Sequence, residues 1–302
     1  MQLPYFPRHL SILILAGLSF VFASNHVAAR IAFDNGVGLL MALLCRSGGA
    51  CLVLGLLIKA KSIPVALDAQ TLRWQLLAGA LIGVQSYCLY SAVALIPVGI
   101  ALLVFNLSPV VLIFINWATG GGAPTQRTAM ITAVILMGLV LVLNLPGVFA
   151  GRYPVTYDTM KGLCLSLSSA VLFAAALWVT DKKLNRVAGV VRSMLTMALV
   201  FIIAAVLGLS GLLQGAVRLP ANTTGLLALI SLAALYGSGF SILFGLMSRL
   251  EITRHAPVMN VEPVAGLVMG WLVLGQQLAL IQWVGGACVV FGVMALAWRP
   301  GR

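Results

Sequence analysis

Charged residues are scarce in this chain, and the scarcity indicates its class. Only 8% of the 302 residues are charged, and aspartate and glutamate together number 6. A water-soluble domain needs about 25% charged residues to cover its surface. With 62% hydrophobic residues and a mean hydropathy of +1.11, the composition indicates a protein whose solvent is lipid.

Motifs for metal, nucleotide or covalent chemistry are also lacking. The 5 cysteines lie inside apolar runs without CxxC spacing, which predicts neither disulfides nor a metal framework. The sequence has no Walker motif, HExxH or GxSxG, and its 3 histidines are far apart. We therefore expect no cofactor and no enzymatic activity. An intramembrane enzyme with convergent catalytic groups is the alternative class.

The net charge of +12 indicates membrane topology rather than nucleic-acid binding, because the basic residues are spread over the connections instead of gathered on one face. When the connections alternate between two sides of a membrane, one side receives most lysines and arginines. The other side receives only Arg152, Lys161 and Arg218. This bias predicts a multi-pass protein of the cell (inner) membrane with both termini cytoplasmic. A signal peptide over residues 1–29 is the alternative, but its removal would leave nine helices.

Apolar runs long enough to cross a bilayer account for nearly the whole chain. A membrane-spanning helix needs about 20 apolar residues. Ten such segments are predicted, near residues 10–32, 37–58, 74–96, 98–118, 128–146, 161–181, 190–213, 223–248, 256–275 and 280–298. The predicted fold class is an all-α membrane protein with ten transmembrane helices.

The last three segments of each half repeat at an offset of 154 residues. The pattern N-x-x-P-V-x6-W occurs twice, and it aligns Asn106, Pro109, Val110 and Trp117 with Asn260, Pro263, Val264 and Trp271. An odd number of helices in each half makes the second half enter the membrane from the opposite side. The sequence thus predicts two inverted five-helix repeats around a central cavity, residues 1–146 and 161–302, with a connecting loop over 147–160.

Several motifs together resemble the EamA branch of the drug/metabolite transporter superfamily. They are Arg46, the run 90–95 followed by Ser108-Pro109, Glu262-Pro263-Val264 followed by Leu274-Gly275, and Gly285-Gly286-Ala287 with Gly292. The ten-helix, two-repeat plan fits the same family over nearly the whole chain. The resemblance implies transport of small metabolites, commonly outward, and names no compound.

The two matched prolines predict a site near the membrane midplane. Pro109 and Pro263 each deprive the carbonyl four residues earlier of its helical hydrogen bond. Asn106 and Asn260 lie one turn before these prolines, where their side chains can bond to the loosened backbone. Matched proline breaks in two repeats are typical of a transporter's central site. Static kinks that shape helix packing are the alternative interpretation.

Glu262 is the acid placed well inside a predicted span, whereas the first repeat has Ser108 at the equivalent position. A charge at the midplane costs roughly 2.5–3.5 kcal/mol on insertion scales, so this side chain needs a proton, a partner or water. Proton or substrate handling is one interpretation. A fixed ion pair with Arg46 and a helix-cap role beside Pro263 are the alternatives.

Other polar and aromatic residues are weaker candidates for the same pathway. His26 shares a helix face with Arg30 and is able to meet an anionic group, or to be a solvated histidine at a helix end. The repeat makes two predicted helices equivalent, and their aromatic residues are cavity candidates: Tyr87, Tyr90, Tyr236 and Phe240. Packing or lipid contact is the alternative for each of them.

The leading functional hypothesis is a secondary transporter that exports a small metabolite, such as an amino acid, by alternating access with proton coupling at Glu262. Its expected partners are the small-molecule substrate and the lipid bilayer, with no nucleic acid. Glycines at four-residue spacing predict tight helix packing and leave a homodimer as an alternative. A lipid or polyprenyl carrier subunit, or a non-transporting membrane partner, is the competing functional class.

Overall fold

The computed structural model describes residues 6–65, 67–120, 123–142, 156–210, 217–246, 250, 258, 261–277 and 279–297. These residues form α-helices joined by short connections, and the described part of the chain contains no strand. In chain order the helices are α1 (Arg8–Asp34), α2 (Leu39–Ala60), α3 (Ala69–Leu95), α4 (Val98–Phe105), α5 (Ser108–Ala118), α6 (Gln126–Val142), α8 (Tyr157–Lys183), α9 (Gly189–Leu209), α10 (Thr223–Leu246), α12 (Glu262–Leu274) and α13 (Leu280–Ala297). The prediction of an all-helical chain is confirmed.

Most of these helices have the length and composition of membrane spans. Among the described residues, 7 helices are long and apolar enough to cross a bilayer, with α4 and α5 together counted as one of them. Three shorter apolar helices are α6, α12 and α13. Large apolar side chains such as Leu13, Leu209 and Phe291 are exposed on the outside of the bundle, where lipid would cover them.

Polar residues in the connections fix where several helices begin. The Asp68 carboxylate accepts a hydrogen bond from the Thr71 backbone N–H at 2.9 Å, at the start of α3. The Asn222 side chain accepts one from the Gly225 N–H at 2.8 Å, at the start of α10. Such N-caps satisfy backbone donors that have no partner within the helix. Gly275 ends α12 at φ +62°, a left-handed conformation that suits glycine.

Both proline motifs coincide with the start of a helix. The predicted span 98–118 is two helices, because α4 ends at Phe105 and α5 begins at Ser108 with Pro109 as its second residue. Glu262 and Pro263 begin α12 in the same way. The residues before the two starts have almost identical backbone angles, φ −72° and ψ −12° at Leu107 against φ −74° and ψ −13° at Val261. The first interruption thus divides a span into two half-helices.

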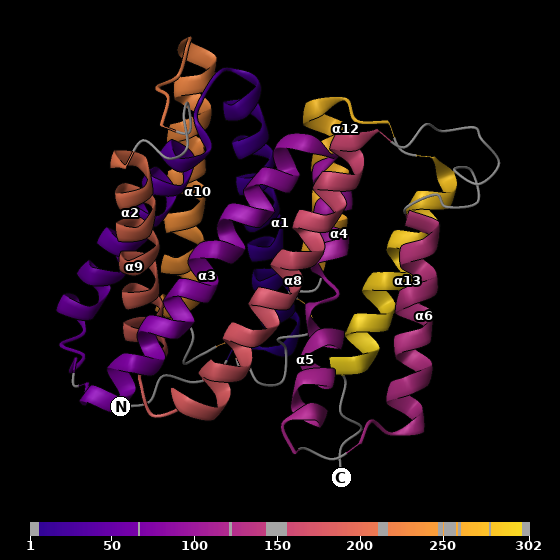
Figure 1. Ribbon diagram of the computed structural model, residues 1–302, viewed down its shortest axis with the longest axis horizontal. Helices are drawn as coiled ribbons and strands as arrows, with labels where there is room; N and C mark the ends of the chain where they lie inside the picture. The colour runs from indigo at the N-terminus through magenta and orange to yellow at the C-terminus, as the bar shows by residue number, and fades with distance from the viewer. Residues whose placement is uncertain are drawn as a thin grey trace.

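Helices that are far apart in the chain pack side by side in the bundle (Figure 1). The helix α3 packs against α8 and α9, and α10 packs against α1 and α2. Three further contacts join α2 with α9, α4 with α12, and α6 with α13. The residues around Arg46 discussed below come mainly from α1, α2, α3, α10 and α12.

Glycines mark the places where backbones approach most closely. A Cβ atom on Gly285 of α13 would lie 2.6 Å from both the Gly138 carbonyl oxygen and the Val142 backbone nitrogen of α6. At the crossing of α4 and α12, a Cβ on Gly99 would overlap Leu267, and one on Gly266 would lie 2.6 Å from a Leu102 methyl group. Of the glycines at four-residue spacing, Gly266 lies at such a close approach, whereas a Cβ on Gly245 would meet nothing within 4 Å.

Candidate functional site

Arg46 is a buried cation in the middle of α2. Its side chain is 4% exposed, and its Nη2 donates a hydrogen bond of 2.8 Å to Ser86 Oγ on α3. The guanidinium carbon lies 4.7 Å from the ring centroid of Tyr90 and 4.4 Å from that of Tyr236. Attraction to an aromatic ring is worth about 2 kcal/mol when the cation is desolvated. These contacts place Arg46 where α2, α3 and α10 meet.

Ser86 belongs to a chain of hydrogen-bonded side chains that fixes the orientation of the Ser86 hydroxyl. The Ser86 hydroxyl donates to Gln85 Oε1 at 3.3 Å, and Gln85 Nε2 donates to Ser169 Oγ of α8 at 2.9 Å. Because its proton is used on Gln85, Ser86 presents a lone pair to Arg46. These hydrogen bonds therefore position the Arg46 guanidinium relative to α3 and α8.

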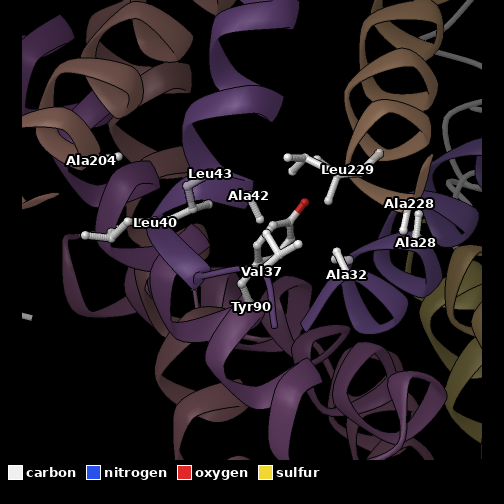
Figure 2. Packing of buried hydrophobic residues seen from close by; sticks show 12 residues of the cluster. Ala28, Ala32, Val37, Leu40, Ala42, Leu43, Tyr90, Ala204, Ala228 and Leu229 are labelled. Atoms are coloured by element: carbon white, nitrogen blue, oxygen red, sulfur yellow. The ribbon is translucent and has the colours of Figure 1, made fainter. Parts of the chain in front are cut away.

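Tyr90 joins three helices through its hydroxyl and its ring. The hydroxyl donates to Asn25 Oδ1 of α1 at 3.0 Å, and Asn25 Nδ2 donates to the Leu232 carbonyl of α10 at 2.7 Å. The ring sits in an apolar cluster that includes Val37 and Ala42 (Figure 2). Tyr90 is 0% exposed, so its hydroxyl and the hydrogen bond to Asn25 are shielded from solvent.

His26 and Glu262 face each other across α1 and α12. His26 Nε2 lies 3.8 Å from Glu262 Oε1, beyond hydrogen-bond length and within reach of an ion pair when the histidine is protonated. The His26 ring also meets the Tyr90 ring edge to face, with centroids 5.7 Å apart. The Glu262 side chain as a whole is 26% exposed.

Aromatic rings extend from Arg46 along one face of α10. Tyr236, Phe240 and Phe244 follow at four-residue spacing, with ring centroids 4.8 Å and 5.8 Å apart. Phe22 of α1 packs on the first two at 6.0 Å and 5.8 Å. Phe244 also lines a hollow of about 280 Å³ at the ends of α2, α9 and α10, together with Leu57, Lys61, Ile63, Ala188, Gly189 and Val190. The aromatic face therefore connects this hollow with Arg46.

The structure brings together six of the residues that the sequence predicted. Contacts of 3.8–5.7 Å link Arg46, His26, Tyr90, Tyr236, Phe240 and Glu262. Tyr87 is half-buried and packs against the apolar cluster around Tyr90. Within the described part of the chain, no carboxylate lies within 4.0 Å of the Arg46 guanidinium, so Arg46 and Glu262 form no direct ion pair.

The residues of the first proline motif lie at the break between α4 and α5. Asn106 and Ser108 are both buried, and Asn106 Nδ2 has no hydrogen-bond partner among the described residues. Pro109 and Pro263 are the second residues of α5 and α12. Asn260 lies outside the described residues. The predicted site thus divides into the central group around Arg46 and the break beside Asn106.

Two of the polar residues that were not predicted from the sequence bond directly to predicted ones. Asn25 and Ser86 hold Tyr90 and Arg46 in place, yet neither belongs to a recognised motif. A signal was present at Ser86, which lies four residues before Tyr90 and therefore on the same face of α3. Asn25 is an amide in an apolar run next to His26, which is also unusual for a membrane helix.

Asn25→Ala tests the network between α1, α3 and α10. The substitution leaves the Tyr90 hydroxyl buried without its acceptor, so we expect a loss of about 1–3 kcal/mol in the free energy of unfolding. The measurement is thermal or denaturant unfolding of the protein in detergent. Ser238→Ala, which removes an exposed hydroxyl bonded to its own helix, is the control and should change it by less than about 0.5 kcal/mol. Equal stability of both variants would contradict the network.

Comparisons with known proteins agree with this architecture. The model of the EamA-like transporter family matches residues 160–298. A Sinorhizobium sp protein named "Uncharacterized transporter in cobO 3'region" is 30% identical over 102 residues, which cover 34% of this chain and 71% of that protein. A solved crystal structure shares the fold with a TM-score of 0.63 at 17% identity, over 96% of this chain and 98% of the other. The chain belongs to the EamA-like transporter family and is a multi-pass membrane protein.

Proposed function

We propose that this protein is a secondary transporter of the cell (inner) membrane that exports a small metabolite, such as an amino acid, and exchanges protons at Glu262. The observation that carries the proposal is the polar group around Arg46, His26 and Glu262, held among helices of an otherwise apolar bundle. Ionisable residues inside membrane helices are costly and usually line a substrate or proton path.

The inverted-repeat arrangement is part of the proposal. It would assign residues 1–146 and 161–302 to two halves that cross the membrane five times each in opposite orientations. The matched backbone angles at Leu107 and Val261 support it. The helix contacts support it as well, because α3 packs on α8 and α9 as α10 packs on α1 and α2, and because α2 meets α9, α4 meets α12 and α6 meets α13. A site between two such halves opens to either side when one half rocks against the other.

The charge asymmetry supports the proposed direction of access. Lys61 and Phe244 line the hollow at the ends of α2 and α10, on the side that receives most basic residues. The positive-inside rule makes this side cytoplasmic, with both termini on it. The aromatic face of α10 then forms the path by which a cytoplasmic substrate approaches Arg46. Outward export would begin at this hollow.

The test is uptake by inside-out membrane vesicles that contain the full chain. Radiolabelled amino acids and small carboxylates are screened with and without an imposed pH gradient, against vesicles that lack the protein. We expect at least one compound to accumulate, faster when the pH gradient is present. Absence of gradient-dependent flux for every compound would contradict the proposal and favour the non-transporting membrane partner.

A further inference from the structure

The buried guanidinium of Arg46 lacks an anionic partner on one edge. Its Nη2 is held by Ser86, but its Nε is fully buried and has no hydrogen-bond partner among the described residues. Leaving a buried donor without an acceptor is costly, and leaving a buried charge without a counter-ion is more costly still. A bound ligand that supplies the missing anionic acceptor would remove this cost.

The surroundings of Arg46 favour an oxyanion as that group. Two tyrosine rings lie against the guanidinium and restrict its movement, while Ser86 fixes its rotation through Nη2. A guanidinium presents its donors as a planar fork that matches the two oxygens of a carboxylate. A guanidinium held in this way loses little entropy when a carboxylate binds, which strengthens the interaction.

Glu262 argues against a doubly charged anion at the same place. Its carboxylate lies 3.8 Å from His26, and the His26 ring packs on Tyr90. The Arg46 guanidinium lies over the same Tyr90 ring. A phosphate dianion near this carboxylate would be repelled. A monoanionic carboxylate bound to Arg46 would be repelled less by Glu262. The rest of such a substrate would meet the rings of Phe22, Tyr236 and Phe240.

We propose that Arg46 is the carboxylate-binding residue of the transported substrate, which is a monocarboxylate or an amino acid with an apolar body. This inference rests on the transport function proposed above, because it names the substrate group that the central site holds. Ser86 and Tyr90 are positioning residues, since they orient the guanidinium and leave its Nε free for the ligand. Tyr236 orients the guanidinium as well and also meets the body of the substrate.

Ligand-induced stabilisation of the purified full-length protein tests the inference. Its 6 tryptophans report unfolding by intrinsic fluorescence in detergent. The probes are the standard L-amino acids, acetate, pyruvate and benzoate, each compared with its primary amide, which has the same shape without the carboxylate charge. We expect at least one acid to raise the unfolding temperature in a saturable way while its amide does not.

Substitutions then assign the effect to Arg46. In Arg46→Gln the Kd for that acid should rise about ten- to a hundredfold, as expected for the loss of a charged hydrogen bond. Arg46→Lys keeps the charge and loses the fork, so its Kd should fall between those of the wild type and Arg46→Gln. The control is Arg73→Gln at the exposed start of α3, which removes the same charge and should leave the Kd unchanged.

Several results would overturn the inference: amides that stabilise the protein as well as the acids, no stabilisation by any acid, or an unchanged Kd in Arg46→Gln. If Arg46→Gln does not unfold cooperatively, an unchanged Kd in Arg46→Lys overturns it. The transport function is judged separately. Binding of an acid without flux in vesicles would contradict the transport function and support carboxylate binding at Arg46. Flux of a compound without a carboxylate, unaffected by Arg46→Gln, would support transport and contradict the role of Arg46.

Discussion

Glu262→Gln should abolish the pH dependence of transport while leaving the protein inserted in the membrane. The amide keeps the size of the side chain at the start of α12 and removes the carboxyl group that, in the proposed coupling, takes up and releases a proton. In inside-out vesicles, we expect the ratio of uptake with and without a pH gradient to fall to about one. Downhill exchange of substrate across the membrane should persist, because alternating access itself needs no proton.

Two controls make this result specific to Glu262. Asp158→Asn makes the same acid-to-amide change at an exposed position in the first turn of α8, and it should retain the pH-gradient response. His26→Gln removes the titratable group that lies 3.8 Å from Glu262. A pH response that survives in Glu262→Gln but disappears in His26→Gln would contradict coupling at Glu262 and assign the proton to His26.

Gly285→Ala should be among the most destabilising single-methyl changes in this protein. The new methyl carbon would lie 2.6 Å from backbone atoms of Gly138 and Val142, and backbone atoms cannot rotate out of the way as a flexible side chain does. The helices α6 and α13 must therefore separate. Overpacking of this kind costs about 1–3 kcal/mol or more, and it should lower the unfolding temperature of the protein in detergent.

Gly55→Ala is the matched control for this experiment. Gly55 is a helical glycine of α2, and a Cβ added to it would meet no neighbouring atom within 4 Å, so the methyl group enters open space. Alanine also favours the helix over glycine by as much as about 1 kcal/mol, and the unfolding temperature should stay the same or rise slightly. If both substitutions lower the unfolding temperature equally, the close approach of α6 and α13 does not determine stability.

The helices themselves could be predicted because lipid imposes simple rules on sequence. A run of about 20 apolar residues has few alternatives to a helix in a bilayer, and most predicted segments agree with observed helices to within a few residues. The interruption in span 98–118 also followed from sequence, since Pro109 deprives Phe105 of a helical bond. These features depend on local chemistry and therefore appear in the local pattern.

The partners of the polar residues could be predicted less well, because they depend on which helices meet. His26 and Arg30 share a face by their spacing, yet His26 faces Glu262 while Arg30 donates to Asp34 and to the Val93 carbonyl. Arg46 was paired with Glu262 in one interpretation, but its observed contacts are Ser86 and two tyrosines. Asn25 was missed because its partners lie 65 and 207 residues away in the chain.

Counterflow by the purified protein in liposomes tests the central claim most directly. Liposomes are loaded with a high concentration of an unlabelled amino acid or monocarboxylate and diluted into a trace of the labelled compound, with protein-free liposomes as the control. A carrier with one central site that opens alternately to each side predicts a transient overshoot of internal label for at least one compound. No overshoot for any compound, in a preparation that unfolds cooperatively, would contradict the account.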